Sequence, residues 1–258
     1  QQALMEMLIS EFSIHSRRVF KSDDTEYRDI DCWNGVQLND DGDVEEIDWS
    51  VDEDVDVLFA SDDESERILL EWLPPTVKQL SINKKHFHGD LQISTLPRGL
   101  RVFDCNSNRL TGEVQLSKLP PVMTHFYAIG NALHGSIDLT NLPENVKRLI
   151  LSGNRFGGTI HISNHPCLEH LHIERNVCEG TLVLADLPQN IQHFNARENR
   201  LTGTIDLTRL PRKLVALTLS ENSFFGTIDL SSLPESLQSL QIDVNEFHGD
   251  VIATNLPP

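Results

Sequence analysis

The sequence is poor in cysteine and tyrosine, and it contains no long apolar run. Its four cysteines include no C-x-x-C pair, which leaves neither a disulfide framework nor a familiar zinc-binding pattern. No stretch of about 18 consecutive apolar residues occurs, so no membrane-spanning helix is expected. Asparagine is common, yet no Asn-x-Ser/Thr acceptor site for glycosylation is present. These absences favour a reducing compartment, and the sequence therefore predicts a cytoplasmic protein.

Basic residues are scarce at the start of the chain. Residues 1–66 carry 21 acidic and 4 basic side chains, whereas residues 67–258 carry 18 and 17. Most of the net charge of −18 therefore lies in the first quarter of the chain, where residues 52–66 are expected to form a solvated acidic loop. Because no basic stripe is present, binding to nucleic acid or to an anionic membrane surface is not expected.

Catalytic motifs are missing as well. The sequence has no nucleophile elbow, no glycine-rich phosphate loop and no paired metal motif. Asp138, Asp206 and Asp229 follow isoleucine in three places because a longer phrase repeats, and a catalytic acid is not expected in several identical copies. The sequence thus predicts a protein that is not an enzyme and needs no cofactor.

What the sequence does contain is a repeat that fills it from about residue 73 onwards. Its anchoring asparagines are spaced 23 residues apart, with one spacing of 22 between the third and the fourth. They are Asn108, Asn131, Asn154, Asn176, Asn199, Asn222 and Asn245. A glycine and a proline recur in the same register, as Gly203 and Pro211 illustrate. Three residue types that share one period indicate a solenoid.

Each repeat carries an L-x-L-x-x-N core, as in Leu217, Leu219 and Asn222. Alternating apolar residues predict a short strand with one face inward, and stacking one strand per turn gives a parallel sheet. The asparagine is expected to bind backbone groups and so to form a ladder from turn to turn. A glycine where the backbone turns, and a Leu-Pro step that disfavours a long helix, predict an opposite side of extended and 3₁₀ pieces.

This phrase resembles the leucine-rich repeat, in the short Gly-x-Ile form known from plant receptor ectodomains and also found in protists. The resemblance covers residues 73–258 as eight repeats, although Asp stands where the plant pattern has Pro after Ile. It implies a β-rich α/β solenoid, a right-handed coil whose parallel sheet lines a concave face. In this family the concave face commonly binds proteins.

Residues 1–72 are expected to cap the first repeat. An amphipathic helix over residues 1–20 and a segment around Cys32-Trp33 precede a hairpin with its turn at Asp41-Gly42. This order resembles the N-terminal cap of plant-type leucine-rich repeat proteins. Leu38 stands where that cap has its second cysteine, so the family's cap disulfide cannot form here.

The outward strand positions of the central repeats predict a binding surface on the concave face. Aromatic, arginine and apolar side chains, which are typical of interface centres, gather there. The candidates are His125, Tyr127, Ile129, Arg148, Ile150, His170, His172, His193 and Arg197. The favoured function is an intracellular scaffold that binds a protein partner, and the alternative is an extracellular or surface receptor or adhesin that binds peptide or glycan. Freely drifting outward residues would also produce such a cluster by accident.

Three of these candidates raise the possibility of a metal site. The strand register places His170, His172 and His193 within about 5–7 Å of one another, close enough for three imidazoles to hold Zn²⁺. Glu174 lies nearby in the sequence. Histidine on a polar sheet face more often binds only water, so no metal is expected.

Overall fold

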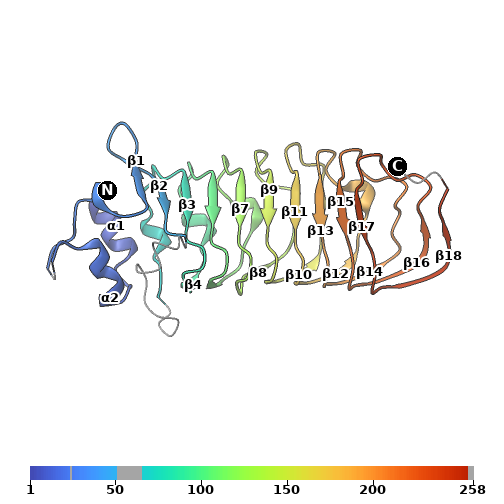
Figure 1. Cartoon of the computed structure of the whole chain (residues 1–258), viewed down its shortest axis with the longest axis horizontal. Helices are drawn as coiled ribbons and strands as arrows, with labels where there is room; N and C mark the ends of the chain where they lie inside the picture. Colours follow the sequence, from blue (N-terminus) through green and yellow to red (C-terminus); the bar gives the residue numbers. More distant parts are fainter. Residues whose placement is uncertain (24, 51–65, 255–258) are drawn as a thin grey trace. The chain divides into compact units, whose positions relative to one another are not determined.

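The computed structural model describes residues 1–23, 25–50 and 66–254. They fall into two compact units, and each is built from stacked short strands (Figure 1). The first unit comprises Gln1–Val114 and Leu119–Leu133, and the second comprises Gln115–Lys118 and His134–Pro258. In the described part of the chain, no helix has the length and apolarity needed to cross a membrane.

The first unit begins with two short helices, α1 (Gln2–Leu8) and α2 (Ile14–Arg17), where the sequence predicted one helix over residues 1–20. That prediction was wrong because Ser13 starts a new helix, with its hydroxyl accepting a hydrogen bond from the Ser16 amide. Phe12, just before it, packs on Trp49 and Phe87. A 3₁₀ turn, η1 (Arg18–Phe20), follows α2 directly.

The predicted hairpin is present and pairs β1 (Val36–Leu38) with β2 (Val44–Asp48) in antiparallel fashion. Its turn spans residues 39–43 rather than two residues, because the Asn39 side chain accepts hydrogen bonds from two amides within it. The 3₁₀ turn η2 (Ile30–Cys32) precedes the hairpin. Phe20, Trp33 and Trp49 pack beneath it as a buried aromatic core, and Cys32 is an exposed free thiol.

The predicted acidic loop lies outside the described residues except for Glu66. That residue is buried rather than solvated, with 5% of its surface exposed. Its carboxylate accepts hydrogen bonds from the Ser13 amide and the Ser16 hydroxyl, which ties it to α2. The 3₁₀ turn η3 (Leu70–Trp72) follows it.

The strands with the L-x-L core form a parallel sheet in each unit, which we call the L-x-L sheet. In the first unit, β2 pairs with β3 (Gln79–Ser81), followed by β5 (Val102–Asp104) and β7 (His125–Tyr127). In the second unit the order is β9 (Arg148–Ile150), β11 (His170–His172), β13 (His193–Asn195), β15 (Ala216–Thr218) and β17 (Ser239–Gln241). The central leucine or phenylalanine of each strand from β9 to β15 is buried, as the alternation predicts.

The glycine-containing segments of the second unit form another parallel sheet, which we call the glycine sheet. Its six strands are β8 (His134–Gly135), β10 (Arg155–Thr159), β12 (Val177–Thr181), β14 (Arg200–Gly203), β16 (Ser223–Asp229) and β18 (Glu246–Ile252). In the first unit, β4 (His88–Asp90) pairs with β6 (Arg109–Thr111). The sequence predicted extended pieces here but not their pairing. The 3₁₀ pieces also occur, as η4 (Ile93–Thr95), η5 (Leu116–Lys118) and η6 (Leu184–Asp186).

A glycine allows these strands to lie side by side. Gly203 has a φ of +94°, and a Cβ placed on it would lie 2.9 Å from the Cγ2 of Thr181 in the neighbouring strand. Both the left-handed conformation and the close contact exclude a larger residue at this position.

The predicted asparagine ladder is confirmed. The Asn176 amide nitrogen donates to the carbonyls of Ile173 and Glu174 in its own turn and to that of Leu151 in the turn before. Its side-chain oxygen accepts a hydrogen bond from the Phe156 amide at 2.9 Å. Asn199 and Asn222 repeat the pattern, so the ladder links each turn to its predecessor.

The single repeat of 22 residues has an unusual turn. In the other turns an amide three residues after proline donates to the proline carbonyl, as from Ile191 to Pro188. In the short turn His165 takes the place of that proline. Its Nε2 donates to the Pro143 carbonyl at 2.9 Å, and its Nδ1 accepts from the Leu168 amide at 3.1 Å. A side chain thus supplies the bonds that the shortened backbone lacks.

Candidate functional site

The structure places seven of the nine predicted candidates on strands of the L-x-L sheets, whereas Ile129 and Arg197 lie two residues after β7 and β13. His125, Tyr127 and Ile129 belong to the first unit. The rings of His125 and Tyr127 stack at 5.9 Å, and Ile129 has 38% of its surface exposed. The other six candidates belong to the second unit.

In the second unit the sheet register brings three histidines together. His170 lies directly opposite Arg148 on one side and His193 on the other. The rings of His170 and His193 stack with centroids 4.7 Å apart and planes within 5° of each other. The His172 ring meets that of His170 edge-on at 6.3 Å. We call His170, His172 and His193 the histidine stack.

The surroundings of His170 and His172 favour neutral imidazoles. Burial, followed by the charges of His193 and Arg148, lowers the pKa of His170 from 6.5 to about 4. Burial also lowers the pKa of His172, against an opposing effect of the Glu174 carboxylate. At neutral pH this surface therefore presents uncharged His170 and His172 rings beside the Arg148 guanidinium.

The geometry gives the Zn²⁺ alternative no support. Two of the three rings lie face to face, so their nitrogens do not converge on one point as the ligands of a tetrahedral site do. Among residues 1–23, 25–50 and 66–254, no group of three His, Cys, Asp or Glu side chains is arranged to hold a metal ion.

Two positions that the alternation of the repeat assigns to the outward face are less accessible to solvent than that assignment predicts. Ile150 is only 8% exposed and therefore adds little apolar surface to the candidate site. Ser152, two residues further along the same strand direction, is 5% exposed. Arg148 and Arg197 are exposed, so the accessible part of this surface is polar and aromatic rather than aliphatic.

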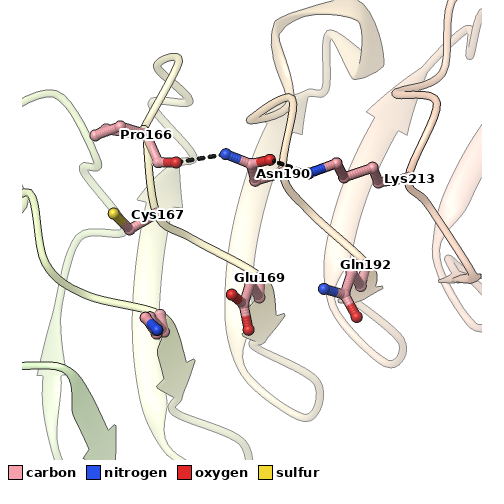
Figure 2. A pocket seen from close by; sticks show the side chains of 7 residues that line it. Pro166, Cys167, Glu169, Asn190, Gln192 and Lys213 are labelled. Carbon is pink, nitrogen blue, oxygen red and sulfur yellow. Dashed lines mark hydrogen bonds between the residues drawn. The ribbon is translucent and has the colours of Figure 1, made fainter.

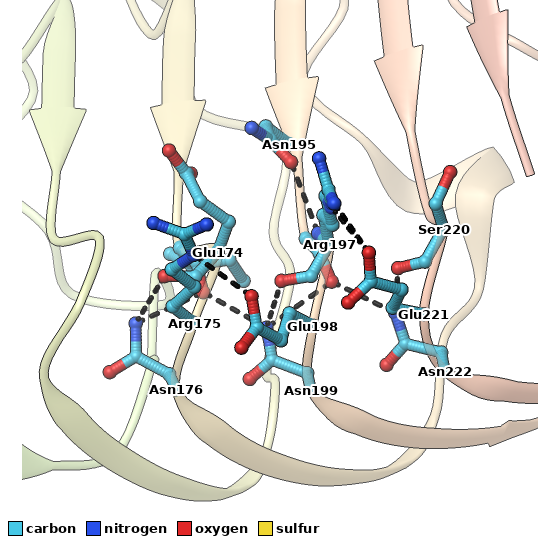
Figure 3. A network of polar contacts seen from close by, with 12 residues as sticks. Glu174, Arg175, Asn176, Asn195, Arg197, Glu198, Asn199, Ser220, Glu221 and Asn222 are labelled. Carbon is cyan, nitrogen blue, oxygen red and sulfur yellow. Dashed lines mark hydrogen bonds and ion pairs between the residues drawn. The ribbon is translucent and has the colours of Figure 1, made fainter. Parts of the chain in front are cut away.

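Figure 3 shows a network of charged side chains in the second unit that the sequence reasoning missed. Arg175 forms an ion pair with Glu198 at 2.8 Å, and Arg197 pairs with Glu221. Arg175, Glu198 and Glu221 each directly precede a ladder asparagine and have φ between 55° and 58°. The recurrence of charged residues at this one repeat position is the sequence signal that could have revealed the network.

A small pocket lies beside the short turn of the second unit (Figure 2). It has a volume of about 260 Å³ and is lined by Lys147, Pro166, Cys167, Glu169, Asn190, Gln192 and Lys213. The Lys213 ammonium donates to the Asn190 side-chain oxygen at 2.7 Å, and the Asn190 amide donates to the Pro166 carbonyl. Two lysines and one glutamate give this pocket a mixed polar lining.

The lowered pKa of His170 predicts a loss of stability in acid. The unfolded chain takes up a proton near pH 6.5, whereas folded His170 does so only near pH 4, so stability falls as pH drops through that interval. We expect wild type to lose more stability between pH 7.5 and pH 4.5 than His170→Gln, as measured by urea unfolding at both values. His134→Gln, on the glycine sheet, is the control. Equal losses in wild type and His170→Gln would contradict the assignment.

Comparisons with known proteins identify the fold. No protein-family model matches the chain. No curated protein is similar to it in sequence. Among solved structures it is similar to the leucine-rich repeat ectodomain of the plant membrane receptor kinase GASSHO1/SCHENGEN3 from Arabidopsis thaliana, in complex with CASPARIAN STRIP INTEGRITY FACTOR 2. That match has a TM-score of 0.74 and 23% identity, and it covers 98% of this chain but only 30% of the receptor chain.

Two further structures share the fold. The PEPR1–AtPEP1 structure matches with a TM-score of 0.59 and 19% identity over 97% of this chain and 42% of the other. A plant ice-binding protein matches with the same TM-score and identity over 98% of this chain and 87% of the other. The chain thus spans less than half the length of the GASSHO1/SCHENGEN3 and PEPR1 chains. Its 23-residue phrase, its asparagine ladder and these matches together identify its fold as a leucine-rich repeat β-solenoid.

Proposed function

We propose that this chain is a non-catalytic binding module that recognises a protein or peptide on the outward face of its L-x-L sheet. The observation that carries the proposal is the histidine stack of the second unit, flanked by Arg148 and Arg197. Flat rings and arginine are enriched where protein interfaces make their strongest contacts. Stacked rings also lose little conformational freedom on binding, which favours affinity.

The similar structures support a peptide or protein as the ligand. The GASSHO1/SCHENGEN3 ectodomain was solved in complex with CASPARIAN STRIP INTEGRITY FACTOR 2, which shows that this fold serves recognition there. Because that likeness is one of fold, the ligand class is our proposal for this chain and does not follow from fold alone. The similar receptors also support the extracellular alternative, whereas the cytoplasmic prediction receives no support from them.

Affinity capture from a lysate or secretome of the source cells tests the proposal. Wild type is compared with a second-unit variant carrying Arg148→Ala and His172→Ala, and with Tyr127→Ala in the first unit. A matched control carries Arg155→Ala and Glu179→Ala, two exposed positions on the glycine sheet. We expect the second-unit variant to bind the captured partner about tenfold or more weakly and the control to bind it unchanged.

The opposite pattern is equally informative. A partner retained by the second-unit variant but lost by the control would place the binding surface on the glycine sheet. A partner lost only by Tyr127→Ala would place it on the first unit. Either result would overturn the proposed location, provided that circular dichroism shows each variant to be folded.

A further inference from the structure

The outward face of the second unit contains an acidic side chain that the fold leaves uncompensated. We infer that Glu174 and Ser152 form a subsite for a positively charged side chain, lysine or arginine, of the bound peptide segment. This inference rests on the proposed function and specifies the chemistry of the ligand at one position.

The two residues lie next to each other in adjacent turns. His172 is opposite Ile150 in the sheet, and Glu174 and Ser152 follow two residues further along. The Gly153 amide donates to the Glu174 carbonyl at 2.8 Å, so the two backbones remain side by side there. Both side chains therefore reach the same part of the outward face.

Both side chains hold an oxygen that is shielded from water and has no hydrogen-bond partner. These atoms are Oγ of Ser152 and Oε2 of Glu174. Ser152 is 95% buried, since only 5% of its surface is exposed. Buried polar atoms in folded proteins are nearly always hydrogen-bonded, so an unpartnered carboxylate oxygen in one turn and an unpartnered hydroxyl in the adjacent turn point to a polar group supplied from outside, and the carboxylate requires that group to be a donor.

The neighbouring cations do not fill this role, because each already has a carboxylate. Arg197 occupies the same repeat position as Glu174, one turn later, and it pairs with Glu221. Arg175 pairs with Glu198 (Figure 3). Each ion pair joins two adjacent turns, and neither includes Glu174. The network thus contains one carboxylate more than it has arginines to neutralise.

A cationic ligand suits the subsite in charge and in geometry. An ammonium group has three donors and a guanidinium has five, and either can serve a carboxylate oxygen and a hydroxyl together. The Glu174 side chain is only half-buried, and its terminal torsion is soft, so a small rotation presents Oε2 to an incoming donor. Burial keeps the pKa of His170 and His172 low, so these two rings do not repel the cation at neutral pH.

A randomised peptide library displayed on phage tests the subsite. It is panned on wild type, and binders are retained only if the Arg148→Ala, His172→Ala variant loses them, which selects for the outward face. We expect these peptides to share a lysine or arginine at one aligned position. Replacing that residue by norleucine or citrulline in a synthetic peptide should weaken binding to wild type about tenfold to a hundredfold.

Glu174→Gln removes the charge while keeping the size of the side chain, and Ser152→Ala removes the hydroxyl. We expect the cationic peptide and its norleucine or citrulline form to bind Glu174→Gln equally, which shows that the preference resides in this carboxylate. Glu179→Gln, the same change on the glycine sheet, should keep the full preference.

The outcomes separate the two proposals. Peptides that need Arg148 and His172 but show no preference for a basic residue would overturn the subsite and leave the binding face intact. A preference that survives in Glu174→Gln would also overturn the subsite. A library that yields no peptide sensitive to the Arg148→Ala, His172→Ala variant would overturn both.

Discussion

Replacing Asn176 with alanine is expected to lower the free energy of unfolding by about 3–4 kcal/mol. The change removes three donated hydrogen bonds and one accepted bond, and three of these four bonds are buried. The Leu151 carbonyl keeps its bond from the Asn154 side chain, whereas the buried Phe156 amide loses its bond to the Asn176 side-chain oxygen. Each buried, unpaired group costs about 1–3 kcal/mol.

Denaturant unfolding of the two proteins side by side measures this effect. Asn141→Ala is the control, because Asn141 is exposed and its side chain contacts only the neighbouring Thr140 hydroxyl. The control should unfold within about 0.5 kcal/mol of wild type. An Asn176→Ala protein as stable as the control would show that the ladder contributes little to the fold.

Leu171→Ala is expected to destabilise the second unit by about 3–4 kcal/mol through a different mechanism. Leu171 is the central residue of β11, is fully buried and lies between Leu149 and Phe194 in the sheet register. Truncation removes buried apolar surface and leaves a cavity that neighbouring turns cannot close without breaking their own register. Thermal or urea unfolding measures the loss.

Val183→Ala provides the matched comparison for that cavity. Val183 is also aliphatic, yet 56% of its surface is exposed, so its truncation should change stability by about 0.5 kcal/mol or less. If both substitutions had the same small effect on stability, the assignment of the L-x-L leucines to the buried interior would be wrong.

The period of the sequence was sufficient to predict most of the fold. Leu217 and Leu219 were assigned inward and are buried, and the asparagines were assigned to a ladder and form one. These predictions succeeded because each position recurs in identical surroundings, so one local argument applies to every turn.

The features that the sequence did not predict depend on contacts between different segments. Pairing within the glycine sheet requires the register of two turns at once, as in the contact of Gly203 with Thr181. Phe12, which lies between α1 and α2, packs on Trp49, a residue far away in sequence. Alternation and helical periodicity describe one segment at a time and contain no such information.

The candidate site was predicted in part. Strand register alone placed His170, His172 and His193 on one face, and the structure brings them together. Which side chains pair with which was not predictable, because Arg197 reaches Glu221 rather than Glu174 through its choice of rotamer. The unpartnered carboxylate oxygen of Glu174 can be identified only when those ion pairs are known.

The ring of His165 has a consequence for how the gene can change. By bonding to Pro143 and to Leu168, it lets the turn tolerate the loss of one codon while the strands on both sides stay in register. The same deletion inside a strand would move every following side chain of that strand to the other face of the sheet. Insertions and deletions of a single codon are therefore expected to occur mainly at these turns. Larger insertions and deletions should instead add or remove whole repeats.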